Sequence, residues 1–208
     1  MNNTLITEKE IWSILSKNDY EKFLEVLKST GLVPKQTKRL AIQATDYYRK
    51  DLDTRIRITN GIPEIMQKKG GWNDDIRNEI AIPLAPDSHI VLSAYKMIRN
   101  LLTGENIETA IIQTENTIFN NKEYEIKLTH QTGKVDVYNY EVEVYNHDLD
   151  PMEIITKFEM PVNSPNKTPE FWKEWNSKVN LSADLLTDEQ LLEIIKSYLY
   201  QDSKSSNS

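Results

Sequence analysis

Two pairs of glutamates lie near opposite ends of the chain, and each pair has the spacing that places both carboxylates on one face of a strand. Glu8 and Glu10 form the first pair, and Glu141 and Glu143 form the second. In a strand, alternate side chains leave the same face about 7 Å apart, so each pair presents two anionic oxygen donors to one surface. Surfaces rich in carboxylate oxygens favour Mg²⁺ or Mn²⁺ among the divalent metals.

A basic segment with the same period lies between the two acidic pairs. In residues 53–59, Arg55 and Arg57 share one face, while Ile56 and Ile58 cover the other. Taken alone, each segment is more often the solvated face of an edge strand, and the arginines could equally form exposed cross-strand ion pairs. A fold that gathered the acidic and basic faces would hold a divalent metal and a polyanion together.

Composition limits the classes of protein that this chain can belong to. With 208 residues and 38% hydrophobic content, it is long enough for one well-packed domain with a small appendage. The net charge of −7 argues against a protein that binds duplex nucleic acid generally. The absence of cysteine excludes disulfides and thiolate metal sites, so any metal needs oxygen ligands or one of His89, His130 and His147.

Targeting signals are not evident in the sequence. No apolar run approaches the roughly 18 residues that cross a bilayer, and the first residues lack the basic and apolar blocks of a signal peptide. We therefore expect a soluble cytoplasmic protein that does not enter a membrane.

The hydrophobic pattern predicts eight strands with helices between and after them. Strands are expected over residues 5–15, 38–48, 52–60, 64–69, 76–82, 108–119, 123–129 and 136–145. Helices are expected from an N-cap at Asp19 to Gly31 and over residues 86–102, 152–158, 168–175 and 187–200. An antiparallel meander of eight strands is suited to a closed barrel with a polar inner face.

The character of the sequence changes after Pro151. We expect residues 1–150 to form the barrel domain, residues 151–200 a helical extension, and residues 201–208 a disordered polar tail. The aromatic cluster of Phe171, Trp172 and Trp175 is expected to anchor the extension against the barrel rather than to stack on bases.

Four short patterns occur in a fixed order along the middle of the chain. They are a tyrosine-bearing segment at 43–48, an R-x-R segment at 54–58, a lysine before a glycine in 67–72, and an R-x-E segment at 76–80. With the terminal glutamate pairs, this order resembles the CYTH superfamily of triphosphate tunnel metalloenzymes over residues 5–146. The resemblance implies an α+β fold in which an eight-stranded antiparallel closed β-barrel carries flanking helices and a C-terminal helical extension.

The resemblance also implies roles for individual residues. The metal ligands would be Glu8, Glu10, Glu141 and Glu143, the phosphate-binding cations would be Arg55, Arg57, Lys69 and Arg77, and the catalytic acids would be Glu8, Glu10 and Glu79. Lys68 competes with Lys69 for one of these places, and the family's lysine directly before glycine favours Lys69. The implied activity is Mg²⁺- or Mn²⁺-dependent hydrolysis of a nucleoside or organic triphosphate, or of inorganic polyphosphate.

Several positions depart from the family's pattern. Trp12 stands where the opening motif has lysine, Gln113 and Glu115 stand where the sixth strand carries basic residues, and Thr129 replaces an aspartate of the seventh strand. Fewer cations weaken polyphosphate binding, because each charge-assisted hydrogen bond contributes about 1.5–3 kcal/mol.

These departures keep other functions open. One alternative is a catalytically degenerate barrel that binds a nucleotide or another phosphorylated anion, and adenylyl cyclase-type activity is a second chemistry of the superfamily. A third alternative is a protein-interaction module that works through the C-terminal helices. The expected partner is a small-molecule triphosphate or polyphosphate, and the sequence leaves a monomer and a homodimer equally open.

Overall fold

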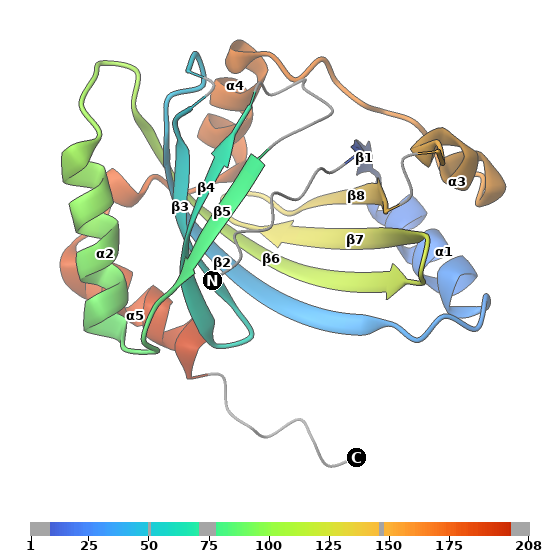
Figure 1. Ribbon diagram of the computed structural model, residues 1–208, viewed down its shortest axis with the longest axis horizontal. Coiled ribbons are helices and arrows are strands. Elements are labelled where there is room, and N and C mark those ends of the chain that lie inside the picture. Colours follow the sequence, from blue (N-terminus) through green and yellow to red (C-terminus); the bar gives the residue numbers. More distant parts are fainter. Residues whose placement is uncertain (1–8, 50, 71–77, 146–147, 201–208) are drawn as a thin grey trace.

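One curved antiparallel sheet runs through the centre of the molecule (Figure 1). The structure is a computed structural model that describes residues 9–49, 51–70, 78–145 and 148–200. Within these ranges, the sheet has eight strands, as predicted. They are β1 (Lys9–Leu15), β2 (Lys35–Thr45), β3 (Asp53–Thr59), β4 (Ile62–Lys69), β5 (Asn78–Pro83), β6 (Glu108–Asn120), β7 (Tyr124–Thr132) and β8 (Val137–Val144).

The strand order differs from a simple meander. The order across the sheet is β1-β8-β7-β6-β2-β3-β4-β5, so two meanders, β2 to β5 and β6 to β8, join where β2 pairs with β6. The first strand pairs with the last, and Lys9 lies opposite Val144. The edge strands are therefore β1 and β5, and the described residues contain no pairing between them. The antiparallel sheet is confirmed, while its closure into a barrel stays a prediction.

Within the described residues, four helices cover the convex face of the sheet in two groups, and the helix over residues 169–179 contributes side chains to the concave side instead (Figure 1). The helices are α1 (Lys17–Lys28), α2 (Ser88–Leu101), α3 (Pro151–Lys157), α4 (Pro169–Val179) and α5 (Asp188–Leu199), with a short 3-10 helix at Ala183–Leu185. One apolar core forms where α2 and α5 pack on β2 and β3, and a second forms where α1 and α3 pack on β1, β7 and β8. Because the apolar side chains of the strands point into these cores, the polar side chains face the concave side.

Strand β3 shows how the sequence sorts its side chains between the two faces. Ile56 and Ile58 are fully buried in the first core, whereas Arg55 and Arg57 lie on the concave face and are partly buried. The alternation of charge and apolar residues that predicted this strand therefore sets which side chains reach the interior of the curved sheet.

Capping residues fix the starts of the helices. Thr187 and Gln190 form a capping box at the start of α5, where the sequence predicts a helix over residues 187–200. Helix α1 begins two residues before the predicted N-cap, because Ser16 accepts a hydrogen bond from the backbone N–H of Asp19. In the described ranges every helix is too short or too polar to cross a bilayer.

The segment that contains α4 is held against the sheet by backbone contacts. The N–H of Ile111 donates to the carbonyl of Leu181 at 2.8 Å, and the N–H of Lys134 donates to the carbonyl of Val179 at 2.8 Å. The backbone approaches so closely at Gly133 that an added Cβ would lie 2.3 Å from the Val179 oxygen. The end of α4 is thus fixed on the sheet, and the predicted boundary between residues 150 and 151 stays a prediction.

Candidate functional site

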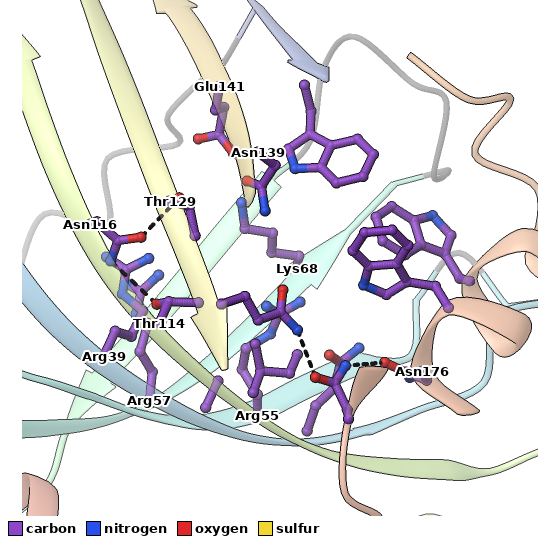
Figure 2. A pocket seen from close by; sticks show the side chains of 18 of the residues that line it. Arg39, Arg55, Arg57, Lys68, Thr114, Asn116, Thr129, Asn139, Glu141 and Asn176 are labelled. Carbon is purple, nitrogen blue, oxygen red and sulfur yellow. Dashed lines mark hydrogen bonds between the residues drawn. The ribbon is translucent and has the colours of Figure 1, made fainter. Parts of the chain in front are cut away.

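A cavity of about 250 Å³ lies inside the concave face of the sheet (Figure 2). Side chains from β1, β2, β3, β4, β6, β7, β8 and α4 line it. Residues from the start, the middle and the end of the chain therefore meet at one place. Most of the lining side chains are polar, and they include carboxylates, guanidinium groups and amides.

Two of the cavity's arginines are paired with acids. The Nη2 atom of Arg55 donates to both carboxylate oxygens of Asp53, at 2.7 and 2.6 Å. The Nε atom of Arg57 donates to Glu64 at 2.6 Å, and its Nη2 atom donates to Glu79 at 2.9 Å. Burial alone would lower the pKa of Arg57, but its hydrogen bonds and charge interactions with these glutamates raise it. Much of the positive charge of this pair is therefore neutralised within the protein.

In contrast to Arg55 and Arg57, Arg39 lines the cavity without a carboxylate among the described residues to neutralise its positive charge. Its Nε atom donates to the hydroxyl of Thr59 at 3.1 Å, and no carboxylate of the described residues forms an ion pair with it. Burial lowers the pKa of Arg39, and the neighbouring charges of Arg57 and Arg55 lower it further. A partly buried guanidinium in this position is stabilised by any anion that enters the cavity.

Two carboxylates, Glu10 and Glu141, interact with each other on another wall of the cavity. The charge of Glu141 raises the pKa of Glu10, and burial raises it further. Burial also opposes ionisation of Glu141, but the charge of Lys127 and the hydrogen bond from its ammonium outweigh this effect and lower the pKa to about 2. Glu141 is therefore ionised and paired, while the negative charge of Glu10 is disfavoured. A cation beside both groups would relieve their repulsion.

The donor set at this pair suits a metal that also binds phosphate. In the part of the chain that the structure describes, no three His, Asp or Glu side chains form a cluster that could hold a metal by themselves. Mg²⁺ is usually held by one or two carboxylates, several waters and substrate phosphates, so Glu10 and Glu141 meet this requirement. Glu143 follows Glu141 on the same face, directly opposite Glu10 in the register of β8 and β1.

Not every predicted site residue lies at the cavity. Glu8 and Arg77 are outside the described residues. Lys69 is exposed, whereas Lys68 lines the cavity with its ammonium 3.4 Å from Glu79. Strand alternation explains this difference, because Lys68 shares the face of Met66 and lies opposite Glu79 in β5.

Glu79 is bound between two cations. Burial raises its pKa, but the charges of Lys68 and Arg57 outweigh that effect and the pKa falls below its ordinary value. An ionised carboxylate in two ion pairs orients its partners, so Glu79 holds Arg57 and Lys68 in place at the cavity.

The side chains of β6 that face the cavity are not the ones expected from the sequence. Gln113 points away from the cavity and accepts a hydrogen bond from the Tyr198 hydroxyl at 3.2 Å, while Glu115 is exposed. Thr114 and Asn116 line the cavity instead. The prediction that Gln113 and Glu115 occupy the cavity positions of this strand is therefore wrong. Thr129 does face the cavity, where its hydroxyl donates to Asn116 at 2.9 Å (Figure 2).

Several lining residues were not identified from the sequence. They are Arg39, Asn116, Lys127, Gln131, Asn139, Lys167, Asn176 and Asn180. Arg39 could have been predicted from the sequence, because it lies four residues before Gln43 of the tyrosine-bearing segment and therefore on the same face of the strand. The tryptophans of α4, expected to act as anchors, do contact Trp12 with ring centroids 5.7 and 5.6 Å apart, and they also line the cavity.

Replacing Glu10 with glutamine should stabilise the fold at pH 7 but not at pH 4. Because the folded-state pKa of Glu10 is raised, its contribution to stability is complete below its ordinary value of 4.5 and is lost as the pH rises through the folded-state pKa. Glutamine does not ionise, so it avoids that loss. Urea unfolding at both pH values measures the difference.

The matched control is Glu123→Gln, which changes an exposed glutamate at a turn. It should shift the urea midpoint by the same small amount at both pH values. An equal shift for Glu10→Gln at pH 4 and pH 7 would contradict the repulsion between Glu10 and Glu141.

Comparisons with known proteins find likeness in structure and none in sequence. No protein-family model matches the chain, and no curated protein matches it. The chain is similar to a candidate adenylate cyclase from Bacillus halodurans, with 16% identity, a TM-score of 0.56, and coverage of 79% of this chain and 97% of that one. It is also similar to the PH1012 protein from Pyrococcus horikoshii OT3, with 14% identity, a TM-score of 0.52, and coverage of 74% and 91%.

A third solved structure covers more of the chain. HpAC1 from Hippeastrum, a candidate adenylyl cyclase with a dominant triphosphatase activity, has 11% identity, a TM-score of 0.52, and coverage of 90% of this chain and 95% of that one. At these identities the likeness shows the fold, and the arrangement of the eight strands and the flanking helices is shared.

Proposed function

We propose that this chain, which has the fold of CYTH-type proteins, is a metal-dependent enzyme that hydrolyses a triphosphate-containing substrate. The observation that carries the proposal is Arg39, a partly buried guanidinium that has no carboxylate partner in the described residues. Glu10 and Glu141 lie on another wall of the same cavity, where the charge of Glu141 raises the pKa of Glu10. A metal–phosphate complex satisfies both walls, because phosphate pairs with the arginine and the metal pairs with the carboxylates.

In this proposal the curved sheet closes into a tunnel. Glu10 on β1 and Lys68 on β4 line the same cavity, and the charge of Lys68 lowers the pKa of Glu10, which supports an approach of the two sheet edges. Residues 1–150 would form the tunnel domain, residues 151–200 the extension that covers one end, and residues 201–208 a tail.

The proposed metal is Mg²⁺ or Mn²⁺, held by Glu10 and Glu141 with Glu8 and Glu143 as further ligands. When bound, it would supply Lewis-acid chemistry by neutralising negative charge on the phosphate. No other cofactor is proposed.

The protein's own residues would orient and stabilise the phosphates. Arg39 would donate to phosphate oxygens, and Arg57 and Lys68, both fixed by Glu79, would add positive charge beside them. Glu10, whose pKa is raised, is the group best suited to accept a proton from the attacking water. Phosphoryl transfer depends mainly on such positioning and charge stabilisation. Arg55 and Arg77 are proposed to assist in binding phosphate.

Phosphate release by the full chain tests the proposal. Tripolyphosphate, ATP and thiamine triphosphate should be supplied with Mg²⁺ or Mn²⁺, and Glu10→Gln should abolish any turnover while Glu123→Gln retains it. If no substrate is consumed by the wild-type chain under either metal, the hydrolase proposal fails. Chromatography of the nucleotide products would separate hydrolysis from cyclisation of ATP.

Internal ion pairs support one alternative, a barrel that binds a nucleotide or another phosphorylated anion without catalysis. Arg55, Arg57 and Lys127 are each paired with a carboxylate, which leaves fewer cations for a polyphosphate. Under this alternative, nucleotides raise the melting temperature by mass action and are recovered unchanged. A melting curve that no nucleotide alters would exclude it.

A further inference from the structure

Three tryptophan rings form one wall of the cavity. Trp172 and Trp175 come from α4 and Trp12 comes from β1, and all three line the cavity while remaining partly exposed. The Trp12 ring centroid lies 5.7 Å from that of Trp172 and 5.6 Å from that of Trp175. If the tryptophans served only to anchor α4, it would be enough for their rings to pack on each other. Their partial exposure to the cavity leaves ring surface for a ligand.

This aromatic wall lies away from Arg39. Helix α4 reaches the sheet at the end of β2, where Asn176 donates a hydrogen bond to the Tyr47 hydroxyl. Arg39 is four residues before Gln43 on β2, which corresponds to about 13 Å along a strand. Figure 2 shows Asn176 on one side of the cavity and Arg39 with Asn116 and Thr114 on the other. The cavity thus has one end at Arg39 and an aromatic end at the three tryptophans, where Lys167 also lies.

Amide side chains surround the aromatic end. Gln131 donates to Asn180 at 2.6 Å, Asn180 donates to Asn176 at 2.7 Å, and Asn176 donates to Tyr47. The three amide residues are buried and line the cavity. Their mutual hydrogen bonds fix the direction of each amide, and a primary amide has more donors and acceptors than this chain of bonds uses. Neutral donors and acceptors beside aromatic faces recognise a polar ring better than they recognise another phosphate.

Trp12 adds a reason that is specific to this chain. It lies opposite Glu141 in the pairing of β1 with β8 and lines the cavity with Glu10, so a ring stands beside the two carboxylates. Lys167 lies 5.7 Å from the centre of that ring, which holds a positive charge on the tryptophan rather than on a phosphate.

We propose that the cavity takes an organic phosphate that carries a planar ring, with the ring against the three tryptophans and the phosphates at Arg39. This inference rests on the proposed function for the phosphate end and adds the organic end. Nucleotides have this chemistry and inorganic polyphosphate does not. Stacking on aromatic side chains should tighten binding by about 10- to 100-fold.

Intrinsic fluorescence gives a direct test, because three of the four tryptophans line the cavity. The full chain carrying Trp72→Phe, which removes the fourth fluorophore, is titrated with ATP and separately with tripolyphosphate in the presence of Mg²⁺. ATP should quench the fluorescence and bind at least about tenfold more tightly than tripolyphosphate. Equal affinities for the two ligands would overturn the inference, even if both were hydrolysed.

Trp12→Lys is the sharpest variant, because it removes a ring and adds a cation on an edge strand. It should weaken ATP binding about tenfold and strengthen tripolyphosphate binding, so the preference falls or reverses. Ligand binding to this variant should be measured by calorimetry, because the variant lacks one of the fluorescent tryptophans. Trp172→Phe retains a ring and should keep the preference, while an equal effect of Trp12→Lys on both ligands would show that the ring is only an anchor.

The outcomes separate this inference from the proposed function. ATP binding that is selective over tripolyphosphate, without any phosphate release, would retain the ring site and reject the hydrolase. Phosphate release with equal affinity for both ligands would retain the hydrolase and reject the ring site.

Discussion

Replacing Arg39 with methionine should weaken the binding of ATP or tripolyphosphate by about 10- to 100-fold, because a charge-assisted hydrogen bond contributes about 1.5–3 kcal/mol. Stability should stay the same or increase. Burial and the charges of Arg57 and Arg55 disfavour the charged form of Arg39 in the folded protein, and methionine removes that penalty. Calorimetric titration and urea unfolding measure the two effects.

Two control variants make the Arg39 result specific. Arg39→Lys keeps a positive charge and should retain most of the affinity, although it loses the planar arrangement of donors. Arg49→Met removes an exposed arginine that is paired with Asp51 and should leave affinity unchanged. A loss of stability in Arg39→Met with unchanged affinity would mean that the residue is structural, and the phosphate site would have to lie elsewhere.

Replacing Glu141 with glutamine should also lower turnover strongly, by at least about 100-fold in metal-dependent phosphate release. The change removes one of the two facing carboxylates and leaves the largely buried ammonium of Lys127 without its carboxylate. Leaving a buried charge unpaired costs about 3 kcal/mol, so the urea midpoint should fall as well. Loss of activity alone would therefore be ambiguous.

The double variant Glu141→Gln with Lys127→Met resolves that ambiguity. Removing both members of the ion pair should recover much of the lost stability, because replacing a buried pair with apolar groups is often neutral. Activity should stay absent, since the carboxylate is still missing. Recovery of phosphate release in the double variant would show that Glu141 acts only through the stability of the fold.

The elements of this fold could be predicted from the sequence because their patterns are strong. Strand β3 alternates arginine with isoleucine, and α5 has a complete capping box at Thr187 and Gln190. The pairing of the strands was harder to predict, because nothing in the sequence of β2 indicates that β6 is its neighbour. A meander is the natural expectation from chain order, and the observed order depends on contacts between distant segments.

Errors in the predicted site occur where neighbouring residues are alike. In β6, Gln113, Thr114, Glu115 and Asn116 are all polar, so the sequence holds no alternation that tells which face is which. The same ambiguity affects adjacent lysines in β4. The residues that α4 and its C-terminal end contribute to the cavity could not be predicted from the sequence. Gln131 and Asn180 are 49 positions apart and come into contact only when the helix packs on the sheet.

The pairing of β1 with β8 has a consequence for how the protein folds. Lys9 cannot find Val144 until most of the chain has left the ribosome, and the Ile111–Leu181 bridge waits longer still. Closing such long loops loses much chain entropy before contacts compensate for it, so folding should be slow compared with helical proteins of this size. A nascent chain can form the β2–β3 and β3–β4 pairings early, but the ligand-binding interior, which is lined by residues from Glu10 to Asn180, would be assembled last, in one cooperative step.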